Sequence, residues 1–170
     1  KGRKARQMEK GVFIHAWDLD KDLEQLTEHL QKMGCGTIAV AVNYHHIGTA
    51  DLRIGHVHYE RNAGTAFSVD KKKYGTVCPE SQGKREEKLQ QLIEKCNQKD
   101  LHFKAWVVNA HNSTLGIRYP ELRVVNVWGD PYDNAICINK DEFLLYEKNL
   151  LKDIEDQFSP SAYIMEAVQW

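Results

Sequence analysis

The chain has 170 residues, of which 42% are hydrophobic and 28% charged, with a formal net charge of −1; these values are typical of one globular domain with a sizeable core. Because Lys and Arg are spread along the chain, the composition argues against nucleic acid or another polyanion as a partner. No apolar run approaches the ~20 residues that a membrane span requires, so we expect a soluble protein without a membrane partner.

The first ten residues contain a cluster of basic charge, KGRKAR at residues 1–6. A short basic stretch at a chain terminus is typical of a solvated, frayed end. We therefore predict a disordered basic leader over residues 1–10 and a single domain over residues 11–170. No signal-peptide apolar region follows the basic residues, and the visible chain favours the cytoplasm only slightly.

The first strand–helix unit begins with GVFIHAW at residues 11–17, whose β-branched and aromatic residues predict a strand. The acidic turn DLD at residues 18–20 predicts a helix N-cap. Apolar residues then recur at helical spacing, namely Leu23, Leu26, Leu30 and Met33. After Gly34, the nearly all-apolar TIAVAV at residues 37–42 is typical of a parallel strand that is covered on both faces.

A long excursion follows the second predicted strand. Residues 47–84 are rich in glycine and have little periodicity, which predicts a loop with a short hairpin at residues 54–59. A helix then begins at Glu86, and its apolar stripe continues to Cys96. A third strand is predicted at residues 101–108.

Another long loop follows the third predicted strand, from residue 109 to about residue 138. Asn139 and Glu142 have the spacing of a capping box, and apolar residues at helical spacing follow as far as Phe158. Pro160 ends this helix, and residues 163–168 form the fourth predicted strand.

The predicted order of elements indicates an α/β fold, because strands that alternate with helices form a parallel sheet through right-handed crossovers. All long insertions follow strands, whereas the connections after helices are short. This asymmetry is typical of a (β/α)8 TIM-type barrel, in which the loops after the strands build the site. Such a barrel has eight units and typically ~250 residues. We therefore interpret the chain as a truncated N-terminal half of a barrel, with about four βα units.

Polar and aromatic residues gather where the predicted strands end, and parallel strands end at one shared rim. An indole can stack on the apolar face of a sugar ring while its N–H stays hydrogen-bonded. We predict that the substrate-binding residues are His15, Asp18, Asn43, His45, His46, Trp106, Asn109, His111, Asn112 and Trp170.

Five segments of the chain carry a resemblance to a known family, and they cover most of residues 11–170. They are GVFIHAWD, LTEHLQKMGCGTIAVAV, EEKLQQLIEKCNQKDLHFKAWVVNAHNS, YPELRVVNVWG and INKDEFLLYEKNLLKDIEDQF. The chain resembles the family of uncharacterised glycosyl-hydrolase-like barrels found mainly in bacteria. In that family the fourth strand is similar to DGIHLDY, whose second acidic residue lies in the presumed site. SAYIMEA places Glu166 at this position, with Glu for Asp and Ala162 for Gly.

This resemblance implies a glycoside hydrolase with a carbohydrate as its partner and Glu166 as catalytic acid/base or nucleophile. Glycoside hydrolysis needs two carboxyl groups that flank the scissile bond, ~5 Å apart for retention or ~6.5–9.5 Å apart for inversion. We expect the second carboxyl group beyond Trp170. Asp18 is the internal rival, although capping a helix is its favoured role. This chemistry needs no cofactor and no metal ion.

Two other functions are compatible with the sequence. A metal-dependent barrel hydrolase would use histidines as zinc ligands, including the H-x-H pair His56 and His58. A non-catalytic carbohydrate-binding barrel would use the same rim without chemistry. The four cysteines are far apart and lack metal-ligand spacing, so we expect four reduced thiols.

Overall fold

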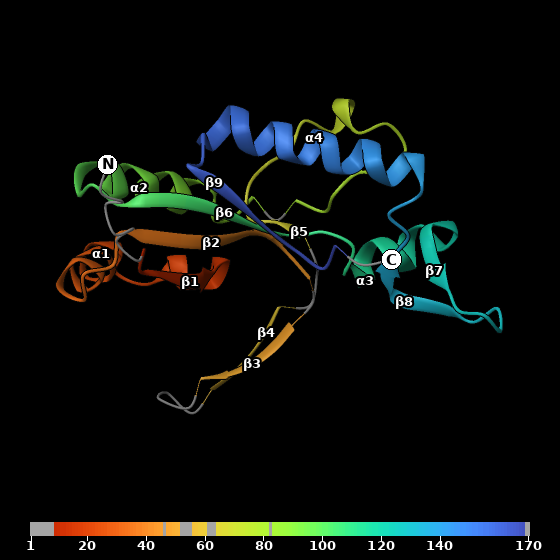
Figure 1. The fold of residues 1–170 in the computed structure, drawn as a ribbon, viewed down its shortest axis with the longest axis horizontal. Helices are drawn as coiled ribbons and strands as arrows, with labels where there is room; N and C mark the ends of the chain where they lie inside the picture. Colours follow the sequence, from red (N-terminus) through yellow and green to blue (C-terminus); the bar gives the residue numbers. More distant parts are fainter. Residues whose placement is uncertain (1–8, 46, 52–55, 61–63, 82, 169–170) are drawn as a thin grey trace, which may run out of the picture.

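The structure is a mixed α/β fold built around one five-stranded sheet (Figure 1). This computed structural model describes residues 9–45, 47–51, 56–60, 64–81 and 83–168. The parallel strands are, in spatial order, β1 (Gly11–His15), β2 (Thr37–Tyr44), β6 (His102–Val108) and β9 (Ala162–Glu166). A short fifth strand, β5 (Gly64–Thr65), pairs antiparallel with β2. The parallel strands lie side by side in the order of the chain, as consecutive strand–helix–strand units require.

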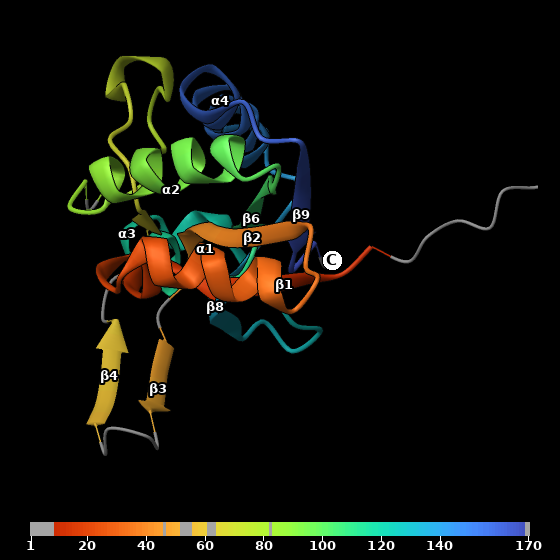
Figure 2. The same ribbon diagram turned by 90° about the vertical axis from the view of Figure 1, so that its left-hand side faces the viewer.

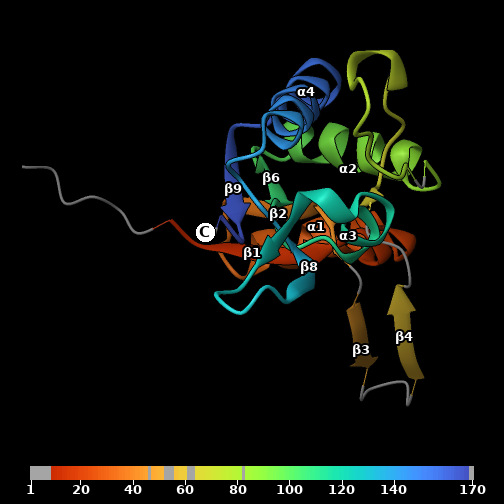
Figure 3. The same cartoon turned by 90° about the vertical axis from the view of Figure 1, so that its right-hand side faces the viewer.

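Three helices cover one face of this sheet: α1 (Leu23–Lys32), α2 (Glu86–Gln98) and α4 (Asp141–Phe158). Figures 2 and 3 show them on the same side of the strands. Their apolar stripes form one core with alternate strand residues such as Ile38 and Val107, which are fully buried. This burial supplies the main driving force for the fold, because removing apolar surface from water is the dominant favourable term.

The helices leave the other face of the sheet open. Successive side chains of a strand point to opposite faces, and Phe13 of β1 points away from the core with 61% of its surface exposed. Ala39 of β2 and Lys104 of β6 share its row across the sheet. At the N-terminal ends of the strands, the Lys104 ammonium contacts the Glu9 carboxylate at 2.7 Å. The open face therefore carries both apolar and charged groups.

The start of α1 differs from the sequence prediction. Its N-cap is Asp22, whose carboxylate accepts hydrogen bonds from the backbone N–H groups of Glu24 at 2.9 Å and Gln25 at 3.1 Å. The predicted cap at residues 18–20 is wrong, because these residues belong to a separate 3-10 helix, η1 (Ala16–Asp20). Both segments contain Asp, a strong N-cap residue, so composition alone did not distinguish them.

The start of α4 also differs from the prediction. The capping box predicted at Asn139 and Glu142 is wrong, because the helix begins at Asp141 and its N-cap Lys140 makes no side-chain cap hydrogen bond. The acidic first turn still complements the positive end of the helix dipole. The predicted end of the helix before Pro160 is confirmed by Ser159, which takes the left-handed conformation with φ of 43°.

The excursion after β2 contains a longer hairpin than the one predicted at residues 54–59. It consists of β3 (Ile47–Asp51) and β4 (His56–Glu60), which pair antiparallel. Figures 1 and 2 show this hairpin extending away from the sheet. The hairpin predicted in this excursion is therefore present, but it begins earlier in the chain, at Ile47.

The rest of this excursion is anchored to α4 by a buried carboxylate. The short helix η2 (Lys71–Lys73) ends next to Tyr74. The Tyr74 hydroxyl donates to Asp153 at 2.9 Å, and the Lys73 ammonium contacts the same carboxylate at 2.6 Å. Only 1% of Asp153 is exposed. Because a buried charge without partners is costly, these two contacts hold the excursion on α4.

The segment after β6 was predicted as a loop, and this prediction is wrong. It contains the helices α3 (Ser113–Arg118) and η3 (Pro120–Leu122) and a hairpin of β7 (Arg123–Val125) and β8 (Pro131–Ile136). The Asn112 N–H donates to the Asn134 carbonyl at 3.0 Å, which helps to fix β8 beside the end of β6. Short strands with an irregular register have little sequence periodicity, which explains why the pattern was missed.

Two expectations from the sequence concern membrane spans and the state of the cysteines. No helix in this part of the chain is both long and apolar enough to cross a membrane. All four cysteines have free thiols, as predicted, and Cys96 is buried.

The close packing of α3 against β8 leads to a first prediction. A Cβ atom at Gly116 would lie 2.2 Å from the Asp133 carbonyl oxygen, so we expect Gly116→Ala to lower the free energy of unfolding by about 1–3 kcal/mol. The control is Gly36→Ala, where a Cβ atom would meet nothing within 4 Å and no loss is expected. Urea unfolding of both variants checks this, and equal stabilities would contradict the packing argument.

Candidate functional site

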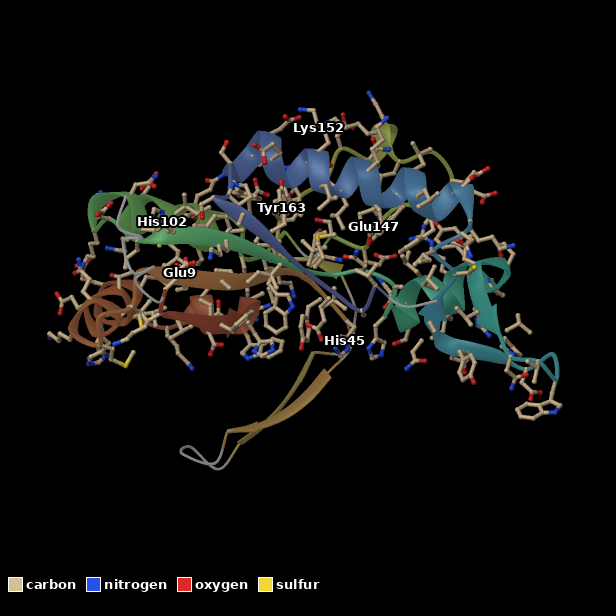
Figure 4. The ribbon with its side chains drawn as sticks, in the orientation of Figure 1. Glu9, His45, His102, Glu147, Lys152 and Tyr163 are labelled. Atoms are coloured by element: carbon tan, nitrogen blue, oxygen red, sulfur yellow. The ribbon has the colours of Figure 1, made fainter. Side chains whose placement is uncertain are left out.

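The C-terminal ends of β1, β2, β6 and β9 meet at one edge of the sheet, where they form a rim of aromatic and ionisable side chains. The rim comprises His15, Trp17, Tyr44, His45, Trp106, His111 and Glu166. Figure 4 shows His45 at this end and Glu9 at the opposite end of the strands. Parallel pairing explains the gathering, because it brings the same end of every strand to one edge.

The carboxylate of Glu166 is held by Trp106 of the neighbouring strand. The indole Nε1–H donates to Glu166 Oε2 at 2.6 Å. The two residues reach each other because Trp106 pairs with Ile164, two positions before Glu166 on the same face of β9. Glu166 is exposed and Trp106 is partly buried, so this carboxylate is both oriented by a neighbour and accessible to a ligand.

The backbone after Glu166 is unusual. Ala167 has φ of 57°, in the left-handed region that non-glycine residues adopt infrequently. The Glu166 carbonyl accepts from Asn109 N–H at 2.9 Å, and the Ala167 carbonyl accepts from Ala110 N–H at 3.2 Å. These bonds maintain the strained residue. Strained backbone clusters at functional sites, because the surrounding structure must hold it in place.

Aromatic rings surround the approach to Glu166. His15 stacks on Trp17 with ring centroids 4.3 Å apart and meets Tyr44 edge-on at 4.9 Å. Trp106 lies 5.2 Å from the His15 ring and 5.0 Å from Tyr44. All four rings are partly exposed. They therefore form an amphipathic surface that combines apolar faces with hydrogen-bonding edges.

Two further imidazoles extend the rim beyond this cluster. His45 stacks on His111 with centroids 4.2 Å apart and on Tyr44 at 4.5 Å. The His111 ring also contacts the side-chain amide of Asn134, with 3.1 Å between His111 Nε2 and Asn134 Nδ2. This contact holds the His111 ring against Asn134 of β8.

The negative charge of Glu166 affects the pKa values of His15 and His111. Burial lowers the pKa of His15, and the carboxylates of Asp18 and Glu166 oppose this shift. Burial likewise lowers the pKa of His111, with Glu166 again opposing. Burial raises the pKa of Tyr44, and Glu166 adds to that rise. One carboxylate thus acts on three ionisable rings, so protonation in this rim is coupled.

Asp18 lies near the rim, but its oxygens are engaged elsewhere. Its Oδ2 accepts from the backbone N–H of His15 at 3.0 Å, and its Oδ1 contacts the Lys21 ammonium at 2.7 Å. Asp18 thereby stabilises η1 and the backbone around His15. Its prediction as a direct substrate contact stays a prediction.

The three asparagines predicted at the rim are buried. Asn112 is 3% exposed, and its Oδ1 caps α3 by accepting from Leu115 N–H at 2.9 Å. Asn109 is 6% and Asn43 is 1% exposed, and the Asn43 amide donates to the Val108 carbonyl at 2.9 Å. Their burial leaves the prediction that they bind substrate untested. We assign Asn112 to the α3 cap.

A β-bulge explains the burial of Asn43. Ala41 pairs with Trp106 but Asn43 pairs with Val107, so Val42 is an extra residue in β2. A bulge changes which face the following side chains take. Asn43 therefore lies inside, and Tyr44 contacts the rings of the rim.

A cavity of about 500 Å³ adjoins the rim on the side of the β7–β8 hairpin. Its lining is mostly aliphatic, with His111, Tyr132 and Asn134 as the polar members. Ala135 of β8 bridges to His111, and Ile136 N–H donates to the Ala110 carbonyl at 2.8 Å. The second insertion therefore forms one wall of a pocket at the end of the sheet.

Several predicted site residues lie outside the described residues. These are His46 and Trp170, and the side chains of His56 and His58 in β4 are likewise not described. Within the described ranges, no group of three or more His, Cys, Asp or Glu side chains could hold a metal ion. The metal-dependent alternative stays untested for the remaining histidines.

The sequence placed Trp17 at a strand end, but the predicted substrate-binding residues did not include Trp17, Tyr44 or the pocket residues of β8. Tyr44 stands between the predicted residues Asn43 and His45, so its position at a strand end was a usable signal. Tyr132 and Asn134 gave no such signal, because they follow β6 by more than twenty positions and come close only through the hairpin.

No protein-family model and no curated protein matches this chain. It is similar to solved structures, including a hypothetical protein from Ruminiclostridium thermocellum, at 15% identity and a TM-score of 0.59, over 94% of this chain and 77% of that one. The noncanonic maltogenic α-amylase AmyB from Thermotoga neapolitana matches 95% of this chain and 39% of its own, at 13% identity and a TM-score of 0.60.

A GH20 catalytic module of the pneumococcal exo-β-D-N-acetylglucosaminidase StrH matches 95% of this chain and 43% of its own, at 12% identity and a TM-score of 0.59. The chain has a glycosidase-like fold. It spans about two fifths of the length of these two glycosidase structures. At identities this low, the likeness is one of fold alone.

A polar layer lies beneath the rim, between β2 and α4. Among the described residues, buried oxygens without a hydrogen-bond partner include Asn43 Oδ1, the Tyr146 hydroxyl and Glu147 Oε1. Burial raises the pKa of Glu147 from its ordinary value of 4.5 to about 7. Figure 4 shows Glu147 on the side of α4 toward the sheet. This carboxyl group titrates near neutrality without contacting the rim.

The raised pKa of Glu147 predicts a pH-dependent stability. Since the folded pKa of about 7 lies above the ordinary 4.5, the unfolded state ionises first, and stability falls as pH rises from 4.5 through 7. Glu147→Gln should remove this loss, so its advantage over wild type should be larger at pH 8 than at pH 5. Urea unfolding measures this, with the exposed Glu142→Gln on the same helix as control; a pH-independent difference would contradict it.

A third prediction concerns the effect of Glu166 on the histidines of the rim. The negative charge of Glu166 favours the protonated forms of His15 and His111, so Glu166→Gln should lower both imidazole pKa values further below 6.5. A titration of the histidine Cε1–H resonances by NMR measures this. The exposed Glu121→Gln serves as the charge-matched control. Unchanged values in Glu166→Gln would show that the carboxylate does not face these rings.

Proposed function

We propose that this rim binds a carbohydrate and takes part in hydrolysis of an O-glycosidic bond, with Glu166 as catalytic acid/base or nucleophile. In this reaction the bond between the anomeric carbon and the glycosidic oxygen breaks. Water adds its hydroxyl to the anomeric carbon, and its proton ends on the leaving oxygen. The observation that carries the proposal is the 2.6 Å hydrogen bond from Trp106 to Glu166.

This hydrogen bond places an accessible carboxylate beside a partly exposed indole, at the C-terminal ends of two parallel strands. Sugar rings have apolar faces and polar edges, which match an aromatic surface with convergent hydrogen-bonding groups. We assign Trp106, Tyr44 and Trp17 to sugar faces, and His15, His45 and His111 to sugar hydroxyl groups. His46 and Trp170 remain proposed substrate contacts from the sequence.

The similar structures support the substrate class. One is an α-amylase by name and another an exo-β-D-N-acetylglucosaminidase module, and a further StrH structure concerns N-glycan recognition and hydrolysis. The sequential parallel strands with helices on one face suit four units of a (β/α)8 barrel, whose sites lie at the C-terminal ends of the strands. We propose that residues 11–170 form such a barrel segment.

Hydrolysis also needs a second carboxyl group. Asp18 is the candidate within the described rim, because it and Glu166 both act on His15. Its two oxygens are however committed to the His15 backbone and to Lys21. We propose that the second carboxyl group lies outside residues 1–170 and that Asp18 positions His15.

Glu166→Gln provides the direct test of this function. In the full-length gene product, we expect it to lower kcat on the glycosides that wild type cleaves by about 10²–10⁴-fold, since acid–base catalysis contributes that much. Binding measured by calorimetry should be retained, because Gln keeps the size and the acceptor for Trp106. A hydrolysis screen on aryl glycosides and polysaccharides, followed by kinetics, gives both values.

The control for this experiment is Glu121→Gln, which changes an exposed carboxylate of η3. Asp18→Asn should lower kcat less than Glu166→Gln; an equal loss would make Asp18 the second carboxyl group. Unchanged turnover in Glu166→Gln would overturn the assignment of Glu166. Binding of glycans without turnover by wild type would favour a non-catalytic carbohydrate-binding protein.

A further inference from the structure

The cavity beside the rim differs in chemistry from the rim itself. Among the described residues, eight line the cavity, and five of these are aliphatic: Ala110, Val124, Ala135, Ile136 and Ala167. The remaining three are His111, Tyr132 and Asn134, and two of these already contact each other at 3.1 Å. Apart from its backbone groups, the cavity therefore offers few free hydrogen-bonding groups to a ligand.

This composition is a poor match for a sugar ring. A pyranose carries a polar group on almost every carbon, and a buried polar group without a hydrogen bond is costly. A ligand group with an apolar body and one or two polar atoms fits better, because small aliphatic side chains leave room and gain from burial. With 50% of its surface exposed, Tyr132 presents an aromatic ring at the mouth of the cavity.

The position of the cavity relative to Glu166 gives it a role. Ala167, the residue after Glu166, lines it, and Ala110 N–H bonds the Ala167 carbonyl at 3.2 Å. The ring cluster of His15, Trp17 and Tyr44 lies at the neighbouring strand ends. Glu166 thus belongs to an amphipathic aromatic surface and directly precedes a residue that lines an aliphatic cavity.

We infer that this cavity is the subsite for the leaving group, and that the substrate is a glycoside with an apolar aglycone of aryl or alkyl type. The inference rests on the proposed function, because it takes the aromatic rim as the sugar side of the scissile bond. The volume of the cavity, about 500 Å³, lies within the usual range of small-molecule sites. It accommodates one aromatic ring with substituents.

The test uses matched ligands that differ only in the aglycone. In the full-length Glu166→Gln protein, which keeps the ligands intact, calorimetry measures the affinities of methyl and p-nitrophenyl glycosides of glucose, galactose, xylose and N-acetylglucosamine. For the sugar that binds, we expect the p-nitrophenyl glycoside to bind at least about tenfold more tightly, since its ring is buried in an apolar cavity.

Filling the cavity should remove this preference. Ala135→Leu adds a side chain inside the lining, and Val124→Phe does so from the other strand of the hairpin. Either should bring the two affinities within about threefold while the methyl glycoside binds as before. Ala162→Leu, at the opposite end of β9, is the matched control and should keep the preference. Trp106→Ala should weaken both ligands alike.

The outcomes separate the two proposals. Equal affinities in the parent protein, or a preference that survives both filling variants, would overturn the aglycone subsite and leave the proposed function standing. If neither ligand of any pair binds, the proposed function fails and this inference falls with it. Correct folding of each variant is checked by circular dichroism, and two independent filling variants keep the test valid if one does not fold.

Discussion

The arrangement of the molecule depends on the burial of one face of a parallel sheet beneath three helices. The core residues of β2 and β6 are fully buried against α1, α2 and α4, whereas the opposite face keeps Phe13 largely exposed. Since each crossover returns the chain in the same direction, all four parallel strands end at one edge. The site is a consequence of this constraint, because residues far apart in sequence become neighbours only where the strands end.

The position of the two long insertions, after β2 and after β6, also depends on this shared edge. They leave the sheet at its C-terminal edge, and both add buried side chains to the core, among them Phe67 and Leu122. The β7–β8 hairpin is bound to the end of β6 through Ala110 and Asn112, and it turns a flat edge into a cavity. Such loops on a rigid scaffold are where a fold of this kind acquires specificity. The aromatic cluster and the aliphatic cavity therefore come from different parts of the chain and supply different chemistry.

Electrostatic coupling is the second theme of the site. Glu166 is hydrogen-bonded to one ring and influences the ionisation of His15, Tyr44 and His111. Beneath them, in the same polar layer as Tyr146 and Asn43, burial raises the pKa of Glu147 to about 7. The rim is accessible and coupled, whereas the layer below it is buried and separate. This difference suits a rim that exchanges protons with a ligand, over a layer that supports it.

The sequence by itself determined the alternation of strands and helices, the parallel sheet, and the position of His15, Trp106 and Glu166 near strand ends, because hydrophobic periodicity is a local property of the chain. It did not locate the α1 cap, since Asp occurs both at residues 18–20 and at Asp22. Tertiary structure alone decided the burial of Asn43, the inclusion of Tyr44 and the cavity beside Ala167. A single extra residue in β2 changes the side-chain alternation, and the cavity walls meet only through long-range pairing, which no local pattern encodes.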